Sequence, residues 1–320
     1  MIFRLKTLSY FVASAVILLG TSTSIAANRS APAVRSVGST ELEMQVLLDR
    51  ANFSSGEIDG KGGKNSREAL AAFQAARSLA PGARSRKAVL KELGAGTVKP
   101  IASYTITAKD AAGPFLKTIP EDATEQAKLP GLYYTSVLEE LAGKFHSAQA
   151  LLKRLNPRAR FIAGEHIRVP NVLGAEQATR AQTGAVKIVV SKKASVLMVY
   201  DREGQVIFYA PVTSGSEHDP LPFGNWVIKD VVRNPTYNYN PALFWDGDQA
   251  DPKVKIAAGP NNPVGVVWMG INVPHYGIHG TPEAGEIGHS ASHGCVRMTN
   301  WDATRVADLV RDGTPVVFEE

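Results

Sequence analysis

The only cysteine of this 320-residue chain, Cys295, closes the run Ser292-His293-Gly294-Cys295. A thiol attacks an amide carbonyl only as the thiolate, so it needs a base or cation nearby to lower a pKa that is about 8.5 in water. Two histidines, His279 and His293, lie within sequence range of the thiol. These residue types indicate nucleophilic catalysis by a cysteine that a histidine activates.

Two residues beside the thiol suit the same chemistry. Gly294 has no Cβ, so the backbone can bend there and bring consecutive N–H groups, including that of Cys295, toward one carbonyl oxygen. Such a pair of donors would form an oxyanion hole. Arg297 is a permanent cation with two parallel donors, a geometry that suits a substrate carboxylate.

Two other interpretations of these residues stay open. Cysteine is commonly a small buried hydrophobic residue, and the glycines around it could mark only a turn. Four of the seven histidines, His275, His279, His289 and His293, also lie within residues 275–293, a composition that could bind zinc. Their spacing matches no zinc-finger or zinc-protease pattern, so we expect neither a metal nor another cofactor.

The N-terminus predicts export. Arg4 and Lys6 precede an apolar run from about Tyr10 to Leu19, and small residues follow up to Ala27, the order of a cleaved signal peptide over residues 1–27. A retained anchor is the alternative, but the run is shorter than the roughly 20 residues that a membrane span needs. We expect no membrane span after cleavage, and a periplasmic or cell-envelope location.

Cysteine count and charge narrow the function classes. An exported chain with one cysteine cannot form an internal disulfide, and an unpaired thiol in an oxidising compartment is a liability unless it has a function. The formal charge is +5, to which the predicted signal contributes Arg4 and Lys6. The remaining excess is small and scattered, so the sequence predicts no nucleic-acid partner.

The residues that carry this chemistry lie in a β-rich segment. Val186, Ile188 and Val190 alternate, a hairpin is predicted over 196–212, and strand character continues to Ile271. A helix over 301–311 and a last strand over 315–318 follow. The sequence therefore predicts a mostly-β, sandwich-like domain with one or two helices over residues 185–320.

Two smaller units precede this domain. After a linker at 28–40, residues 41–95 predict a three-helix unit, in which Asn65 and Glu68 cap the second helix. Residues 103–171 predict an α+β unit whose first helix starts at a capping box formed by Ser136 and Glu139. A second linker over 172–184 completes the expected multidomain order.

The segments 276–281 (Tyr-Gly-Ile-His-Gly-Thr) and 292–298 (Ser-His-Gly-Cys-Val-Arg-Met) together carry a family resemblance. They closely resemble the signature of L,D-transpeptidases with the YkuD-type catalytic domain. The upstream runs 220–228 and 259–270 occur in the order seen in that family. The resemblance spans essentially residues 185–319.

The resemblance implies a role for each matched residue. Cys295 is the expected nucleophile and His279 the base, whose ring the carbonyl of Gly280 orients. Backbone N–H groups of Gly294 and Cys295 would form the oxyanion hole. The remaining residues of the expected site shape the loop or bind substrate; these are Ser292, His293, Tyr276 and Arg297, and for Arg297 a structural role is an alternative to carboxylate binding.

The resemblance also implies substrates and partners. The thiolate would attack the third, diamino acid residue of a peptidoglycan stem and release D-Ala, leaving a thioester that an amine of another stem converts to a crosslink. A wall-attached lipoprotein or water could take the acceptor's place. A carbapenem is the expected inhibitor. Two alternatives remain: a carboxypeptidase or endopeptidase that only hydrolyses these bonds, and a wall-binding protein without catalysis.

The two preceding units have resemblances of their own. Residues 56–60 (Gly-Glu-Ile-Asp-Gly) and 67–74 resemble a peptidoglycan-binding domain. Residues 138–145 and 164–170 resemble a LysM carbohydrate-binding module, with an insertion at 110–134 between its first strand and helix. The resemblance implies contact with the glycan of the wall, whereas the insertion could make this unit a scaffold or a cover for the active-site cleft.

Overall fold

The computed structural model describes residues 40–78, 86–173, 187–245 and 247–320. The predicted signal peptide and almost all of the two predicted linkers lie outside these residues. Val37–Glu320 form one compact unit. Among the helices that the structure describes, none is long and apolar enough to span a membrane.

Three helices open the described chain: α1 (Thr40–Arg50), α2 (Lys64–Ala76) and α3 (Arg86–Glu92). They lie within the segment 41–95 for which the sequence predicts a three-helix unit, apart from Thr40 at the start of α1. One side of α1 packs into a core with the next unit through Leu42 and Val46. Its other side packs with α2, α3 and the catalytic sheet through Met44 and Leu47. α1 is therefore buried on two sides and takes part in two cores.

The predicted cap of α2 is wrong. The helix begins after Gly63, and no side chain caps it. Asn65 lies inside the helix, and its Nδ2 donates to the carbonyl of Ile287 at 2.9 Å. The side-chain amide of Asn65, which the local sequence predicts to cap α2, instead makes a tertiary contact with a distant loop.

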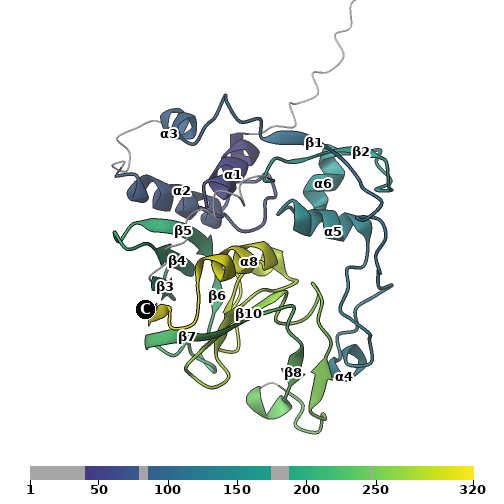
Figure 1. The fold of residues 1–320 in the computed structure, drawn as a ribbon, viewed down its shortest axis with the longest axis vertical. Helices are drawn as coiled ribbons and strands as arrows, with labels where there is room; N and C mark the ends of the chain where they lie inside the picture. The colour runs from purple at the N-terminus through teal and green to yellow at the C-terminus, as the bar shows by residue number, and fades with distance from the viewer. Residues whose placement is uncertain (1–39, 79–85, 174–186, 246) are drawn as a thin grey trace, which may run out of the picture. The chain divides into compact units, whose positions relative to one another are not determined.

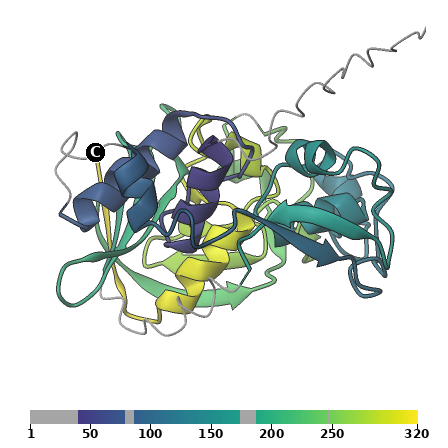
Figure 2. The same cartoon turned by 90° about the horizontal axis from the view of Figure 1, so that it is seen from above.

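The next unit pairs β1 (Ile101–Thr105) with β2 (His166–Pro170) in antiparallel register and packs them against α5 (Val137–Lys144) and α6 (Gln149–Leu155). Figure 2 shows the two-stranded sheet of β1 and β2 beside α5 and α6. Ser136 caps α5 as predicted, accepting from the N–H of Glu139 at 3.2 Å. The carboxylate of Glu139 accepts instead from the N–H of Thr135, so the reciprocal half of the box is displaced by one residue.

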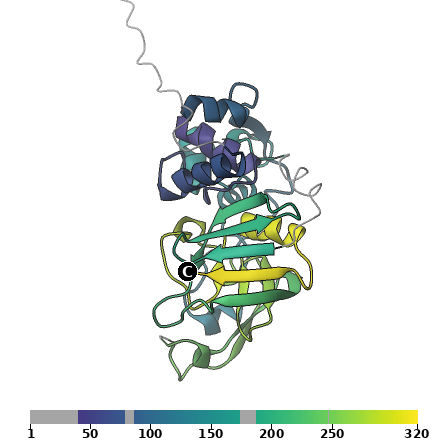
Figure 3. The ribbon, with the colours of Figure 1, turned by 90° about the vertical axis from the view of Figure 1, so that its left-hand side faces the viewer.

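A nine-stranded sheet confirms the mostly-β prediction for the catalytic domain. Its strand order is β5-β4-β3-β13-β7-β10-β11-β12-β6. The strands are β3 (Lys187–Ser191), β4 (Val196–Tyr200), β5 (Val206–Pro211), β6 (Thr213–Ser214), β7 (Gly224–Arg233), β10 (Val267–Ile271), β11 (Gly277–His279), β12 (Val296–Arg297) and β13 (Pro315–Glu319). In Figure 3 the yellow C-terminal strand β13 lies between β3 and β7.

Strand β7 joins the two halves of this sheet. Its first residues pair with β13, and the residues from Ile228 onward pair with β10. Inward side chains of both halves, among them Leu197, Phe208 and Met269, form one apolar core that is almost fully buried. This core fixes the strands that carry the site.

Helix α8 (Asn300–Leu309) packs on the sheet, and Figure 1 shows it between the strands and α5. Thr299 caps it by accepting from the N–H of Asp302 at 3.2 Å. Val306 and Leu309 face the core of the sheet. Asp302 and Arg305 are buried as well, which the amphipathic pattern did not predict. The helix therefore has a second buried side, and that side is charged.

A two-stranded hairpin, β8 (Tyr237–Tyr239) and β9 (Val254–Ile256), stands apart from the large sheet, with a short 3-10 turn, η1 (Pro241–Leu243), between its strands. The short helix α4 (Ala123–Gln126), inside the 110–134 insertion, contacts β9 (Figure 1). Sequence reasoning assigned no structure to this hairpin.

Candidate active site

Two neighbouring strands bring His279 and Cys295 to one face of the sheet. β11 and β12 run parallel, with Ile278 opposite Val296 and His279 opposite Arg297. Ile278 and Val296 are fully buried in the core. Because side chains alternate along a strand, His279 and Arg297 face the other way, as does Cys295, which directly precedes Val296. We call this side of β11 and β12 the reaction face.

His279 is held as a neutral imidazole. Its ring is 4% exposed, and Nδ1 lies 2.7 Å from the carbonyl oxygen of Gly280. A carbonyl only accepts, so Nδ1 carries the proton and Nε2 keeps a free lone pair. Burial lowers the pKa of His279 to about 4; the Gly280 bond opposes this shift, and the charge of Arg297 adds to it. At neutral pH the ring is therefore uncharged, and its Nε2 can accept a hydrogen bond.

Three residues outside the predicted set hold this imidazole. Trp268 is the β10 partner of His279, and its ring stacks on the imidazole with centroids 5.5 Å apart. Asn300 lies against Gly280, where a Cβ would stand 2.3 Å from Asn300 Oδ1. Oδ1 of Asn300 also accepts from the N–H of Val266 at 3.1 Å. The one sequence signal for this contact was the glycine that follows His279.

The side chain of Cys295 points to a backbone carbonyl. The residue is partly exposed, and its Sγ donates to the carbonyl oxygen of His275 at 3.5 Å. Burial raises the pKa of the thiol to about 11, although a backbone hydrogen bond to Gly277 and the charge of Arg297 act in the opposite direction. Within the described residues, Sγ makes no hydrogen bond to the His279 ring. The two groups share a face but are not yet paired.

Ser292 and Gly294 shape the loop before the thiol. Ser292 is 3% exposed; its hydroxyl donates to the carbonyl of Cys295 at 2.6 Å and accepts from the N–H of Gly215 at 2.7 Å. Gly294 has a φ of +97°, and a Cβ there would stand 2.6 Å from the Tyr276 ring. Only glycine meets both conditions without strain.

Aromatic side chains of the hairpin also reach this loop. The ring of His293 meets Phe244 edge-on, with centroids 5.0 Å apart. A charge on Cys295 contributes to raising the pKa of Tyr237, which burial chiefly brings to about 12, and acts similarly on Tyr276. Both phenols therefore lie close to the thiol. Sequence reasoning found Tyr276 but missed Tyr237 and Phe244, because no motif links the hairpin to the thiol.

The 110–134 insertion braces the base of that hairpin. The N–H of Leu132 donates to Ala258 at 3.0 Å, and Leu132 accepts from the N–H of Asn261 at 2.9 Å. Gly259 passes so close that a Cβ there would stand 2.2 Å from the carbonyl oxygen of Leu132. The insertion thus supports the segment that follows β9.

Arg297 borders a separate cavity at the edge of the reaction face. This cavity measures about 610 Å³, and Glu57, Glu283 and Glu286 also line it. Among the described residues, no cluster of three histidine, cysteine, aspartate or glutamate side chains could hold a metal ion. The histidines in 275–293 therefore do not converge as a zinc site would require.

Comparison with known proteins assigns the domain. A family model described as the L,D-transpeptidase catalytic domain, YkuD, matches residues 185–318. The L,D-transpeptidase YkuD of Bacillus licheniformis is 30% identical over 182 residues, which cover 56% of this chain and 91% of that protein. YkuD of Bacillus subtilis is 28% identical and 92% covered. YbiS of Escherichia coli, a probable L,D-transpeptidase by name, is 27% identical and 60% covered.

Solved structures give weaker likenesses. L,D-transpeptidase 3 from Mycobacterium tuberculosis, in complex with a faropenem-derived adduct, is 19% identical over 43% of this chain and 61% of that chain, with a TM-score of 0.36. A second solved structure, of LD transpeptidase LdtMt1 in complex with imipenem, is 20% identical over 42% of this chain and 59% of that chain, with a TM-score of 0.33. The family match and the Bacillus relatives decide the assignment: this chain belongs to the L,D-transpeptidase family and carries its YkuD catalytic domain over residues 185–318.

Proposed function

We propose that this protein is a cysteine-dependent L,D-transpeptidase that acts on peptidoglycan stem peptides through a thioester on Cys295. The observation that carries the proposal is the register of β11 and β12, which sets His279 and Cys295 on one face. Family membership supports the reaction class. The roles of the individual residues rest on the geometry described above.

The acylation step starts from a neutral Cys295 thiol and a neutral His279 imidazole. The thiol leaves the His275 carbonyl and transfers its proton to Nε2 of His279, and Sγ bonds to the carbonyl carbon of the third stem residue. The carbon–nitrogen bond to D-Ala then breaks. The imidazolium returns the proton to the departing amine, so the products are a thioester, free D-Ala and neutral His279.

The second step regenerates the thiol. An amine of another stem attacks the thioester carbonyl, His279 removes its proton, and the sulfur leaves with that proton. The product is a third-to-third-residue crosslink. Water in place of the amine gives hydrolysis, and an amine of a wall-attached lipoprotein gives anchoring.

The neighbouring residues act by positioning. N–H groups of Gly294 and Cys295 receive the developing oxyanion in our proposal, because the φ of +97° at Gly294 is what bends this backbone. Ser292 fixes the loop through its two hydrogen bonds, and the Gly280 carbonyl sets the tautomer of His279. Arg297 is proposed to bind a carboxylate of the stem.

Mass spectrometry of the intact protein tests the proposal. Incubation with a tetrapeptide stem should add the acyl mass to Cys295 and release D-Ala, and a carbapenem, whose strained amide is open to the same attack, should acylate the same thiol. Cys295→Ala is the control and should give neither adduct. Wild-type protein that stays unmodified by both compounds would rule the function out.

The products of that incubation identify the acceptor. Crosslinked dimer supports the transferase, whereas free acid without dimer would favour the hydrolase. Cys295→Ala should still bind isolated cell wall if the two N-terminal units contact it, as their predicted resemblances imply. Loss of wall binding on deletion of residues 41–171 would support that role.

Export to the periplasm or cell envelope is part of the same proposal. Its support is the sequence pattern of residues 1–27. N-terminal sequencing of the protein recovered from the periplasm should begin after Ala26 or Ala27. Recovery of intact Met1 in the cytoplasm alone would contradict it.

A further inference from the structure

The loop between the two reacting residues is held by the N-terminal helical part. Nδ2 of Asn65, in α2, donates to the carbonyl of Ile287 at 2.9 Å. At Gly288 a Cβ would stand 2.8 Å from Oδ1 of Asn65, so the two segments touch. Residues 281–294 connect His279 to Cys295. The N-terminal helical part, made of α1–α3, therefore contacts the catalytic domain at the loop that joins His279 to Cys295.

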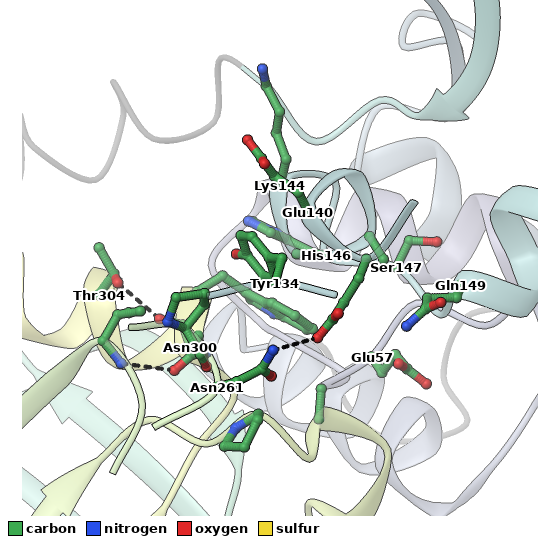
Figure 4. A pocket seen from close by; sticks show the side chains of 18 of the residues that line it. Glu57, Tyr134, Glu140, Lys144, His146, Ser147, Gln149, Asn261, Asn300 and Thr304 are labelled. Carbon is green, nitrogen blue, oxygen red and sulfur yellow. Dashed lines mark hydrogen bonds between the residues drawn. The ribbon is translucent and has the colours of Figure 1, made fainter. Parts of the chain in front are cut away.

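Three cavities meet beside this contact. One of about 610 Å³ reaches Arg297 at the edge of the reaction face. One of about 860 Å³ lies between α5, α8 and the segment Thr281–Pro282, and a third of about 120 Å³ lies against the glycine-rich loop 56–63. Glu57 and Ala284 line all three. In Figure 4 Glu57 lies across the largest cavity from Asn300 and Thr304.

The backbone around Glu57 is fixed on both sides. Before it, the N–H of Ser54 donates to Tyr209 at 2.8 Å, and the Ser54 hydroxyl donates to Asp302 at 2.8 Å. After it, the N–H of Ile58 donates to His146 at 2.9 Å. Gln45 holds the following turn by accepting from the N–H of Gly60 at 2.8 Å. Because hydrogen bonds hold the backbone on both sides, the position of the Glu57 Cα is fixed. A residue that binds a ligand specifically needs such a fixed position.

The carboxylate of Glu57 has no hydrogen bond or ion pair within the described residues. Partial burial and the charge of Asp59 raise its pKa, against the opposing charge of Lys61. The hydroxyl of Ser55 is unpartnered too: it is 4% exposed and lines the small cavity next to Glu57. A half-buried carboxylate without a protein partner, beside a buried hydroxyl that has none, fits a ligand that donates hydrogen bonds.

The cavity of about 610 Å³ is lined by charges of both signs: Arg297, which its strand position puts on the reaction face, and the carboxylates Glu57, Glu283 and Glu286. A diamino acid at Cys295 whose side chain entered this cavity would meet these carboxylates. A side chain that ends in an ammonium group fits them by charge.

We propose that Glu57 binds the free ammonium group of the diamino acid whose carbonyl Cys295 attacks, so that the N-terminal helical part selects the stem. The proposal rests on the proposed function. It makes Glu57 a specificity-determining residue contributed from outside the catalytic domain. The bound group keeps its proton, so no step of the reaction passes through Glu57.

A substrate-by-variant comparison tests this. The rate of Cys295 acylation is measured by mass spectrometry with a tetrapeptide stem that has a free side-chain amine and with the same stem acetylated on that amine. Wild type should prefer the free amine about tenfold, the effect of one charge-assisted hydrogen bond, and Glu57→Gln should react with both alike. Glu57→Asp should recover part of the preference.

Matched controls separate the outcomes. Glu43→Gln, on α1 and away from these three cavities, should behave as wild type. A preference that survives in Glu57→Gln, or that disappears only in Glu286→Gln, would overturn the assignment to Glu57. No acylation of either stem by the wild type would instead refute the proposed function itself, and equal melting temperatures would confirm that the variants fold.

Discussion

Two groups of buried titratable side chains in this protein have opposite charge states. At the reaction face, burial leaves both Cys295 and His279 neutral, with pKa values of about 11 and about 4. On the other side of α8, Asp49 is as fully buried as His279, yet Arg305 and His146 hold its pKa far below the usual range despite that burial.

The number of hydrogen-bond partners accounts for the contrast. Asp49 accepts from both terminal nitrogens of Arg305, at 2.9 and 3.2 Å, and lies 3.0 Å from Nδ1 of His146. At the reaction face His279 contacts the Gly280 carbonyl, and Cys295 contacts only backbone groups, the His275 carbonyl and Gly277, so neither has a charged side-chain partner as close as those of Asp49. A charge without partners is costly in a protein interior, whereas a charge with several is retained. The charged cluster around Asp49 stabilises the fold. At the reaction face both side chains are neutral, so a proton can pass from one to the other during the proposed reaction.

The charged cluster joins three segments of the chain. Asp49 comes from α1, His146 from the turn after α5, and Arg305 from α8. The first residue of α8, Asn300, packs on Gly280, whose carbonyl orients His279. The cluster therefore supports the helix whose first residue packs beside His279.

Removing the shared carboxylate should have the largest effect. Asp49→Ala leaves Arg305 buried without its main counter-ion and should lower the free energy of unfolding by about 3–5 kcal/mol. Chemical denaturation measures the change. Asp308→Ala, which breaks the more exposed pair with Arg233, is the matched control and should cost less than about 1 kcal/mol. Equal losses in the two variants would contradict the contrast between the cluster and the surface.

Gly294→Ala should lower the rate of acylation at the reaction face and leave the charged cluster around Asp49 unchanged. The added Cβ meets the Tyr276 ring and disfavours the φ of +97°, so the proposed oxyanion donors should move and acylation should fall about a hundredfold. Gly204→Ala is the control, since its φ is +76° but no atom lies within 4 Å of the added Cβ. A Gly294→Ala variant with full acylation rates would remove this loop from the mechanism.

We expect the smallest change in stability for Asp302. Its pKa is raised whereas that of Asp49 is lowered, so the two carboxyl groups give stability an opposite dependence on pH. Burial raises the pKa of Asp302 from 3.8 to about 6; Arg305 opposes this shift and Asp49 adds to it. Between those values the folded protein keeps a proton that the unfolded chain has released, so this group's contribution to stability falls as pH rises through that range. Asp302→Asn should remove this fall in stability, measured by denaturation at several pH values. An unchanged pH profile would show that Asp302 ionises normally.

The reaction face was largely predictable from sequence, and the cluster was not. The segments 276–281 and 292–298 are short and chemically distinctive, and alternating apolar residues predicted the strands that carry them. Asp49, His146 and Arg305 are far apart along the chain, and each looks like an ordinary surface residue. Arg305 and Asp302 fall on the polar side of α8 by pattern, and only tertiary packing buries that side.

The same limit explains the other misses. Asn65 was assigned to a helix cap because local sequence cannot show that the loop at Ile287 lies within reach. Trp268 and Tyr237 approach the site through strand register and the hairpin, which no nearby motif marks. The register of β11 and β12 follows from strands that the sequence does not mark individually, and the hydrogen bond of Cys295 to His275 could not be anticipated either.

The titration of Cys295 tests the central claim most directly. The rate of its alkylation by iodoacetamide is followed from neutral into alkaline pH, with Cys295→Ala as the blank and His279→Ala alongside. Our account predicts a rate that climbs steadily with pH toward the value of about 11, with no plateau near neutrality, because the resting pair is neutral. A fast plateau at neutral pH that disappears in His279→Ala would reveal a resting thiolate–imidazolium pair and contradict it.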